Sequence, residues 1–312
     1  MPGARQLKSS HWCDTATRRR TANGSKPPGA QYANFSRVTA GPPPTMLGLS
    51  PTLLIELALL GLCTGFLAGL LGLGGGMMMV PFLTILLTAR GYPEASIVKI
   101  AVATSLATIC FTSLSSVRAH HRRGAVLWHV AAVLAPGILV GSFLGSQIAA
   151  ALPAQTLGIV FAVFVAFSAT QMLLNRKPKP SRTLPGRAGM FGVGNGIGML
   201  SSLVGAGGAF VSVPFMAWCN VPIHNAVATS SALGFPIALA GTVGYLLAGW
   251  SLPAMPAGVI GYLFWPGLVV LSVASMVTAP LGARVAHSMD IAPLKRAFAV
   301  VLYCLAAYFV LR

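Results

Sequence analysis

The most restrictive feature of this sequence is a succession of apolar segments, most of them about as long as a membrane-spanning helix. A helix needs about 20 apolar residues to cross the hydrocarbon core of a bilayer. The segments lie at about 51–71, 76–89, 95–117, 125–150, 155–174, 189–204, 208–220, 224–248, 256–286 and 292–311. Only 8% of the 312 residues are charged, against about a quarter in an average soluble domain. The sequence therefore predicts an all-α, polytopic membrane protein with about eight to ten helices.

The net charge of +17 does not indicate a nucleic-acid-binding protein once the basic residues are located along the chain. They gather in the first 45 residues and in short loops, above all at 118–123 and 176–187. Basic loops of this kind are typical of the cytoplasmic side of a membrane protein. No basic stripe with interleaved aromatic residues occurs. We therefore expect a lipid bilayer, and no nucleic acid, as a partner.

Two of the apolar segments carry the same glycine-rich motif. It reads GFLAGLLGLGGGMMMVPF at 65–82 and GMLSSLVGAGGAFVSVPF at 198–215, and six glycine, proline and phenylalanine residues match at a constant separation of 133 positions. Glycine clusters and proline both weaken a helix. A broken helix is tolerated within a membrane only where protein or a water-filled cavity satisfies its backbone. Each copy therefore predicts a discontinuous segment that breaks at its glycine cluster.

Two further blocks recur in the same order, which indicates two homologous repeats. AVATS at 101–105 returns at 226–230, and four residues between 145 and 161 match four residues located 137 positions later. The expected regions are a disordered basic tail (1–45), a first membrane repeat (46–174), a basic cytoplasmic linker (175–187) and a second membrane repeat (188–312). Met46 directly precedes the first apolar segment and is an alternative start of the chain.

Two topologies are compatible with these segments. Segments 76–89 and 208–220 hold about 13–14 residues, too few for an untilted span. If they are re-entrant, each repeat crosses the membrane four times and the repeats are parallel. If they cross fully, each repeat crosses five times and the repeats are inverted, as in many secondary carriers. We favour four spans in each repeat.

The glycine breaks predict an anion-binding site. The N–H groups at the start of the half-helix after each break have no partner within that helix and carry the positive end of its dipole. The amides of Gly74, Gly75 and Gly76 in the first repeat, and of Gly207 and Gly208 in the second, are therefore candidate substrate ligands. The alternative is close packing of helices through small residues.

Hydroxyl groups lie in the middle of the apolar segments that follow the breaks. Thr104 and Ser105 recur as Thr229 and Ser230. Such a duplicated pair can line a substrate pathway and offer hydroxyl donors to an oxyanion. Alternatively, these side chains bond back to carbonyl groups of their own helices.

Lys99 and His224 are candidate auxiliary charges of the same site. Each stands five residues before the duplicated threonine of its repeat, and an ionisable group inside a span is a functional candidate. For Lys99 the alternative is that its side chain snorkels to the membrane interface. Glu56, within the first apolar segment, is expected at the interface.

No sequence pattern indicates a cofactor, a metal site or an enzyme. The five cysteines are scattered singly, and no Cys/His spacing suits zinc. His120 and His121 belong to a basic loop. Gly72 and Gly74 begin a dinucleotide-binding pattern, but Met77 stands where its third glycine is required. We therefore expect no cofactor, no metal and no catalytic residues.

At these motifs the sequence resembles the TauE/SafE family of sulfite exporters, also called the 4-toluene sulfonate uptake permease family. The resemblance lies in GLLGLGGG at 69–76, VPF at 80–82, AVATS in both copies and GAGGAFVSVPF at 205–215. It covers about 51–311. It implies a multi-pass transporter of the inner (plasma) membrane, with about eight spans, that moves sulfite, sulfonates or related sulfur-containing anions.

Together these patterns predict a secondary transporter that exports a small anion bound between the two repeats. A transporter of another small inorganic or organic anion is the first alternative. A membrane-embedded enzyme and a scaffold without transport activity are alternatives of a different class. The sequence leaves open whether the protein forms a homo-oligomer.

Overall fold

The computed structural model describes residues 50–71, 75–174, 183–250, 252, 256, 258–285 and 292–311, all within one compact unit, Thr45–Arg312. The described residues form ten α-helices and one short hairpin of two β-strands. Six of these helices are long and apolar enough to cross a membrane. This confirms the prediction of an all-α membrane protein with eight to ten helices. The predicted tail (1–45) and most of the predicted linker lie outside the described residues.

The two predicted repeats contribute five helices each. The first repeat holds α2 (Pro51–Leu71), α3 (Gly76–Ala89), α4 (Glu94–His121), α5 (Trp128–Ala151) and α6 (Ala154–Leu174). The second holds α7 (Arg187–Val204), α8 (Ala209–Trp218), α9 (Ile223–Gly249), α10 (Trp265–Val285) and α11 (Ala292–Leu311). The expected apolar segment 256–286 is only partly helical, because β1 (Val259–Ile260) and β2 (Leu263–Phe264) pair antiparallel before α10 begins.

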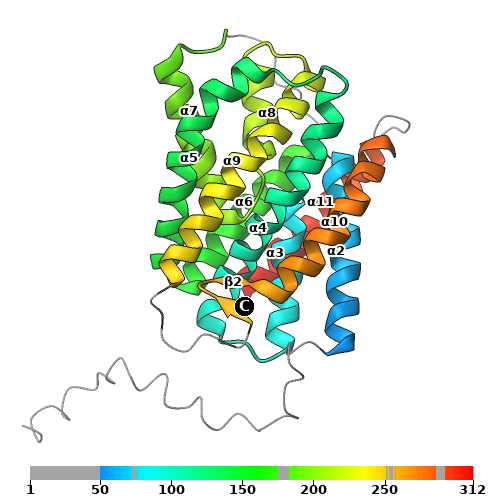
Figure 1. Ribbon diagram of the computed structural model, residues 1–312, viewed down its shortest axis with the longest axis vertical. Helices are drawn as coiled ribbons and strands as arrows, with labels where there is room; N and C mark the ends of the chain where they lie inside the picture. Colours follow the sequence, from blue (N-terminus) through cyan, green and yellow to red (C-terminus); the bar gives the residue numbers. More distant parts are fainter. Residues whose placement is uncertain are drawn as a thin grey trace, which may run out of the picture. The chain divides into compact units, whose positions relative to one another are not determined.

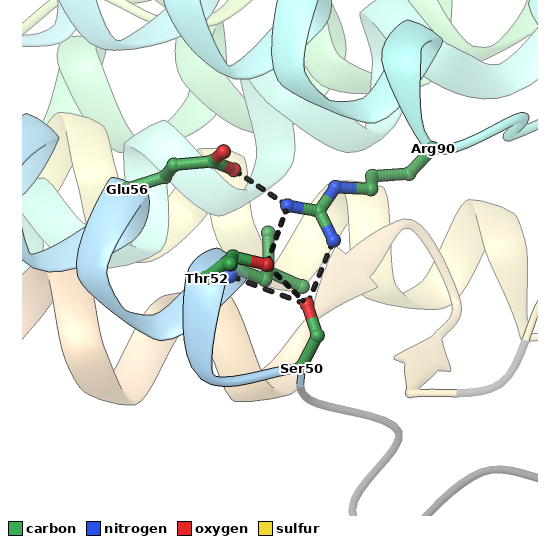
Figure 2. Close-up of polar contacts among 5 residues, drawn as sticks. Ser50, Thr52, Glu56 and Arg90 are labelled. Atoms are coloured by element: carbon green, nitrogen blue, oxygen red, sulfur yellow. Dashed lines mark hydrogen bonds and ion pairs between the residues drawn. The ribbon is translucent and has the colours of Figure 1, made fainter.

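Helices α2 and α3 form a hairpin whose open end is joined by polar contacts (Figure 2). The guanidinium group of Arg90, which follows α3, donates to Glu56 Oε2 at 2.7 Å and to Ser50 Oγ at 2.8 Å. Because Glu56 and Ser50 lie at the start of α2, α3 runs back toward the end where α2 begins. The ion pair is partly exposed, so it contributes at most about 1 kcal/mol to stability.

The first helices of the two repeats run in opposite directions. In Figure 1, α2 and α10 begin at the lower end of the view, whereas α7 and α9 begin at the upper end. The upper end carries Arg118 in the last turn of α4, Arg187 at the start of α7 and Arg284 in the last turn of α10. The positive-inside rule assigns such an end to the cytoplasm. These directions are the ones expected if the two repeats are inverted. The number of spans in each repeat stays a prediction.

Two helix pairs, each with one helix from either repeat, flank the centre of the fold. Helix α2 packs most extensively against α10, and α5 against α7; we call these pairs the α2–α10 arm and the α5–α7 arm. A Cβ atom on Gly65 would collide with the backbone of Ser275, and one on Gly198 with the backbone of Ile138. Gly198 lies 133 positions after Gly65, and Ser275 lies 137 positions after Ile138. Both are separations at which the sequence repeats, so the two contacts are equivalent and support the duplication.

Helices α4 and α9 cross between the two arms. Helix α4 is the most buried of the six candidate spans, and it contacts α9, α10 and the short α3. Helix α9 contacts α5 and the short α8 in the same way. Helices α6 and α11 pack mainly against each other. The two glycine breaks therefore lie next to the α4–α9 crossing, enclosed by protein.

We expect Gly198→Val to destabilise the protein by about 1–3 kcal/mol more than Gly196→Val, because overpacking a tight contact costs this much. Both residues lie in α7, but a Cβ atom on Gly196 would have no other atom within 4 Å. Thermal unfolding of the purified variants in detergent measures the difference. Equal unfolding temperatures would contradict the close contact between α7 and α5.

Candidate functional site

Both glycine motifs break their helices, as the sequence predicted. Helix α3 begins directly after Gly75 and helix α8 directly after Gly208. These glycines have φ angles of 69° and 75°, in the left-handed region that glycine occupies without steric cost. Gly205, which ends α7, has a φ of 71°. The candidate ligand Gly74 lies outside the described residues.

The start of α8 retains backbone donors. No side chain caps this helix at Gly208, and the first bonds back to the Gly208 carbonyl come from Val211 and Ser212. Among the described residues, the N–H groups of Ala209 and Phe210 therefore have no acceptor, as expected for the first turn of a helix. Helix α3 begins in the same way after Gly75. Both helix starts can donate to an anion.

The break of the second repeat lies against the start of α3 in the first. The Ser105 hydroxyl of α4 donates to the carbonyl oxygen of Gly205 at 3.1 Å. A Cβ atom on Gly76 would collide with the same oxygen and would stand 3.0 Å from Ser105 Oγ. Only glycine fits at position 76, and the predicted ligands Gly76 and Ser105 do lie together.

Thr104 and Thr229 make equivalent hydrogen bonds across the repeats. Thr104 Oγ1 accepts from the N–H of Phe264 at 3.0 Å, and Thr229 Oγ1 accepts from the N–H of Leu127 at 3.0 Å. Phe264 and Leu127 directly precede α10 and α5 and are 137 positions apart. Each threonine thus fixes the start of a helix that comes from the other repeat.

A small cavity lies between the α2–α10 arm and the crossing helices α4 and α9. Its volume is about 20 Å³, enough for one water molecule. Five of its lining residues carry hydroxyl groups, and none of the described lining residues is charged. The hydroxyl residues are Thr112, Ser113 and Ser116 from α4 and Ser230 and Ser231 from α9; Gly207 of the second break and Gly234 also line the cavity. We call this space the hydroxyl cavity.

Hydroxyl groups of the cavity bond to another hydroxyl group or to carbonyl groups of their own helices. Ser230 Oγ pairs with Ser212 Oγ of α8 at 2.7 Å. Ser113 and Ser231 donate to Cys110 O and Val227 O of their own helices. Serine hydroxyls commonly bond to a carbonyl group of their own helix, and such a hydroxyl can rotate to donate to another acceptor. The cavity can therefore offer several donors to an anion without a fixed full charge.

The structure brings only part of the predicted site together. Ser230 and Gly207 line the hydroxyl cavity, whereas Thr104 and Thr229 do not. Lys99 Nζ donates to Ala150 O at the end of α5, at 2.6 Å, and lies 5.7 Å from the ring centroid of Tyr262. Lys99 stands near the start of α4, away from the hydroxyl cavity.

His224 also lies away from the cavity, exposed in the first turn of α9. The duplicated motifs did not point to Thr112, Ser113 and Ser116. A usable signal was present in α4, where hydroxyl residues recur every four positions from 104 to 116 and thus mark one face of the helix.

A family model described as "Sulfite exporter TauE/SafE" matches residues 57–309, which span both arms, both breaks and the hydroxyl cavity. The chain belongs to the TauE/SafE family. It is similar over 257 residues, at 33% identity, to a "Probable membrane transporter protein" of Haemophilus influenzae, covering 82% of this chain and 97% of the relative. This family membership and the six candidate spans make it a multi-pass integral membrane transporter.

Two further relatives come from distant organisms. The "Probable membrane transporter protein YdhB" of Bacillus subtilis is 27% identical, covering 75% of this chain and 90% of the relative. The "Probable membrane transporter protein MJ0441" of Methanocaldococcus jannaschii is 28% identical, covering 73% and 82%. No solved structure is detectably similar to this chain. The family and these relatives are described as transporters and not as enzymes.

We expect Thr229→Val to lower the free energy of unfolding by about 1–2 kcal/mol, because it leaves the partly buried N–H of Leu127 without its acceptor. Thr229→Ser keeps the oxygen and should cost much less. Denaturation of both variants in detergent measures the difference. Equal stability of the two variants would show that the hydrogen bond across the repeats contributes nothing.

Proposed function

We propose that this protein exports a small sulfur oxyanion, sulfite or an organosulfonate, across the inner membrane, and that the hydroxyl cavity is part of the binding site. Membership of the TauE/SafE family supports the class of substrate. The observation that carries the site is the hydroxyl cavity, which joins hydroxyl groups of both repeats to the backbone at Gly207.

The chemistry of the lining favours an anion over a cation. Cation sites in membranes normally contain carboxylates, and none of the described residues around the hydroxyl cavity is acidic. Hydroxyl groups and helix N-termini donate to oxyanions. Since none of these donors carries a full charge, the bound anion is not trapped by an ion pair. Sulfite and organosulfonates present the same sulfur-bound oxygens to such donors.

The size of the cavity implies that the α2–α10 arm moves during transport. A volume of about 20 Å³ holds one water molecule, and sulfite, with three oxygens around sulfur, is several times larger. The arm contributes Ala68 and Ala279 to the lining. Movement of this arm away from α4 and α9 would enlarge the cavity for the substrate. Such a movement involves helices of both repeats.

The membrane potential can drive export of an anion. A potential of 100 mV, negative inside, favours the exit of one negative charge by about 2.3 kcal/mol. The chain has no nucleotide-binding motif in its sequence, which supports a secondary transporter. The opposite directions of α2 and α7 support alternating access by inverted repeats.

The proposal is tested with the purified protein in proteoliposomes. We expect uptake of [35S]sulfite to exceed that of protein-free liposomes and to respond to an imposed potential. Competition by methanesulfonate, sulfate, phosphate and acetate then separates sulfur oxyanions from other anions. Transport of acetate or phosphate in preference to sulfite would overturn the substrate class, and transport of none of these anions would overturn the proposed function.

We expect Gly234→Ala to lower sulfite transport at least about tenfold, which corresponds to about 1.4 kcal/mol, without loss of stability. A Cβ atom at position 234 would stand 3.5 Å from Ser113 Cβ and 3.7 Å from Gly207 O, which are ordinary contacts. The methyl group would therefore fit, but it would occupy the hydroxyl cavity. Gly192→Ala is the matched control, because a Cβ atom there meets no atom within 4 Å. Normal transport by Gly234→Ala would remove this cavity from the substrate pathway.

A further inference from the structure

The hydroxyl cavity has a counterpart on the other side of the α4–α9 crossing. Equivalent positions in the two repeats are separated by 133 residues in α2 and α7, by 125 in α4 and α9, and by 137 in α5 and α10. By these separations, four residues that line the cavity correspond to four residues of the other repeat. In order, Ala68, Gly69, Ser230 and Ala279 correspond to Ser201, Ser202, Ser105 and Ser142. All four counterparts are serines, and we call them the serine cluster.

Ser142, Ser201 and Ser202 belong to the α5–α7 arm, and Ser105 of α4 bonds to Gly205 O at the end of α7. Two of them, Ser142 and Ser202, pack closely against helix α9. A Cβ atom on Gly241 of α9 would stand 3.1 Å from Ser142 Oγ and 3.5 Å from Ser202 Cβ. It would also stand 2.9 Å from Leu106 Cδ1, and Leu106 is the counterpart of the cavity residue Ser231. Three counterparts of cavity residues, Ser142, Ser202 and Leu106, thus meet around Gly241 in close contact.

Three hydrogen bonds hold the α5–α7 side of the crossing closed. Ser142 Oγ donates to Ile237 O at 2.7 Å, and Gln147 Nε2 donates to Gly244 O at 2.8 Å. The hydroxyl of Tyr245 donates to Ser202 O at 3.2 Å. Each bond joins the α5–α7 arm to α9. The two sides of the crossing therefore differ, because one side contains a cavity and the other is packed and hydrogen-bonded.

Ser201 is the member of the serine cluster whose hydroxyl group makes no hydrogen bond in this closed packing. Its hydroxyl is fully buried and has no hydrogen-bond partner among the described residues. The oxygen lies at the start of α8, 3.1 Å from the point where a Cβ atom on Gly208 would stand. A buried hydroxyl without a partner is costly. At this place it adds a free donor to the free N–H groups of the α8 N-terminus.

We propose that Ser105, Ser142, Ser201 and Ser202 form a second binding site for the same small oxyanion, which opens when the α5–α7 arm moves away from α9. This inference rests on the proposed function. The second site lies on the side of the crossing opposite the hydroxyl cavity, so the anion passes from one set of hydroxyl groups to the other. Ser201 then donates to the anion in the open state.

A missing partner alone does not distinguish Ser201, because Ser168 and Ser272 also have buried oxygens without a partner among the described residues. Ser201 differs from them because it lies beside the N-terminus of α8 and belongs to the serine cluster. Ser168 of α6 has the same burial and the same lack of a partner, but it does not belong to the serine cluster. It therefore provides a matched control.

The decisive experiment compares Ser201→Ala with Ser168→Ala in proteoliposomes loaded for [35S]sulfite counterflow. Since the Ser201 hydroxyl is buried without a bond in the closed packing, we expect Ser201→Ala to unfold at or above the wild-type temperature. We expect its counterflow rate to fall at least about tenfold, as for loss of a hydrogen bond to a charged ligand. Ser168→Ala should also unfold at or above the wild-type temperature, but it should keep the wild-type rate.

The outcomes separate this proposal from the proposed function. No counterflow by the wild-type protein would show that sulfite transport itself is wrong. Normal wild-type counterflow with an unchanged rate for Ser201→Ala would overturn only the second site. A slower Ser201→Ala protein that is also less stable than Ser168→Ala would overturn it too, because the hydroxyl would then have a structural role.

A second measurement tests the opening of this side directly. In a background without native cysteines, Ser202→Cys, which leaves the three closing hydrogen bonds in place, is exposed to a membrane-impermeant thiol reagent in the absence of sulfite, which itself reacts with such reagents. We expect slow labelling, and labelling at least about tenfold faster when Gln147→Ala removes one of the closing hydrogen bonds. Ser146→Ala, whose hydroxyl bonds only to Phe143 O of its own helix, should leave the rate unchanged. Equal labelling in all three proteins would overturn the opening.

Discussion

Hydrogen bonding of the backbone in an apolar environment is the constraint on which this structure depends. Within a bilayer each unpaired N–H or carbonyl group costs several kcal/mol, yet two helices of this protein are broken. The breaks persist because the opposite repeat covers them. Ser105 of the first repeat donates to Gly205 O in the second, and the helix starts at Leu127 and Phe264 are held by threonines of the other repeat. These bonds satisfy one carbonyl group at a break and the starts of two helices, and they also hold the repeats together.

The composition of the two arms determines which helices can move together during transport. Each arm joins helices from both repeats, so a movement of one arm against α4 and α9 is not a movement of one sequence half against the other. The α5–α7 arm is bonded to α9 through Ser142, Gln147 and Tyr245, whereas a cavity separates part of the α2–α10 arm from the crossing. A duplicated fold with two unlike sides is what a carrier with two access states requires.

The sequence predicted the features that single residues encode. The breaks follow from glycine at positions 75 and 208, where φ is positive, and the membrane class follows from apolar length. The pairing of α2 with α10 could not be predicted, because helices that are apolar all round show no face that marks a partner. Thr104 and Thr229 accept hydrogen bonds from residues 160 and 102 positions away, which local sequence patterns could not predict.

The cross-repeat pairing of α2 has a consequence for synthesis of the chain. Ser275 of α10 donates to Gly61 of α2 across 214 positions of sequence. At a ribosomal rate of about 5–20 residues per second, α10 emerges roughly 10–40 s after α2. During that interval the glycine-lined surface of α2 is already made, but its final neighbour does not yet exist. Insertion machinery or lipid must therefore cover this surface until α10 is made. During that interval the nascent chain is most exposed to quality-control proteases.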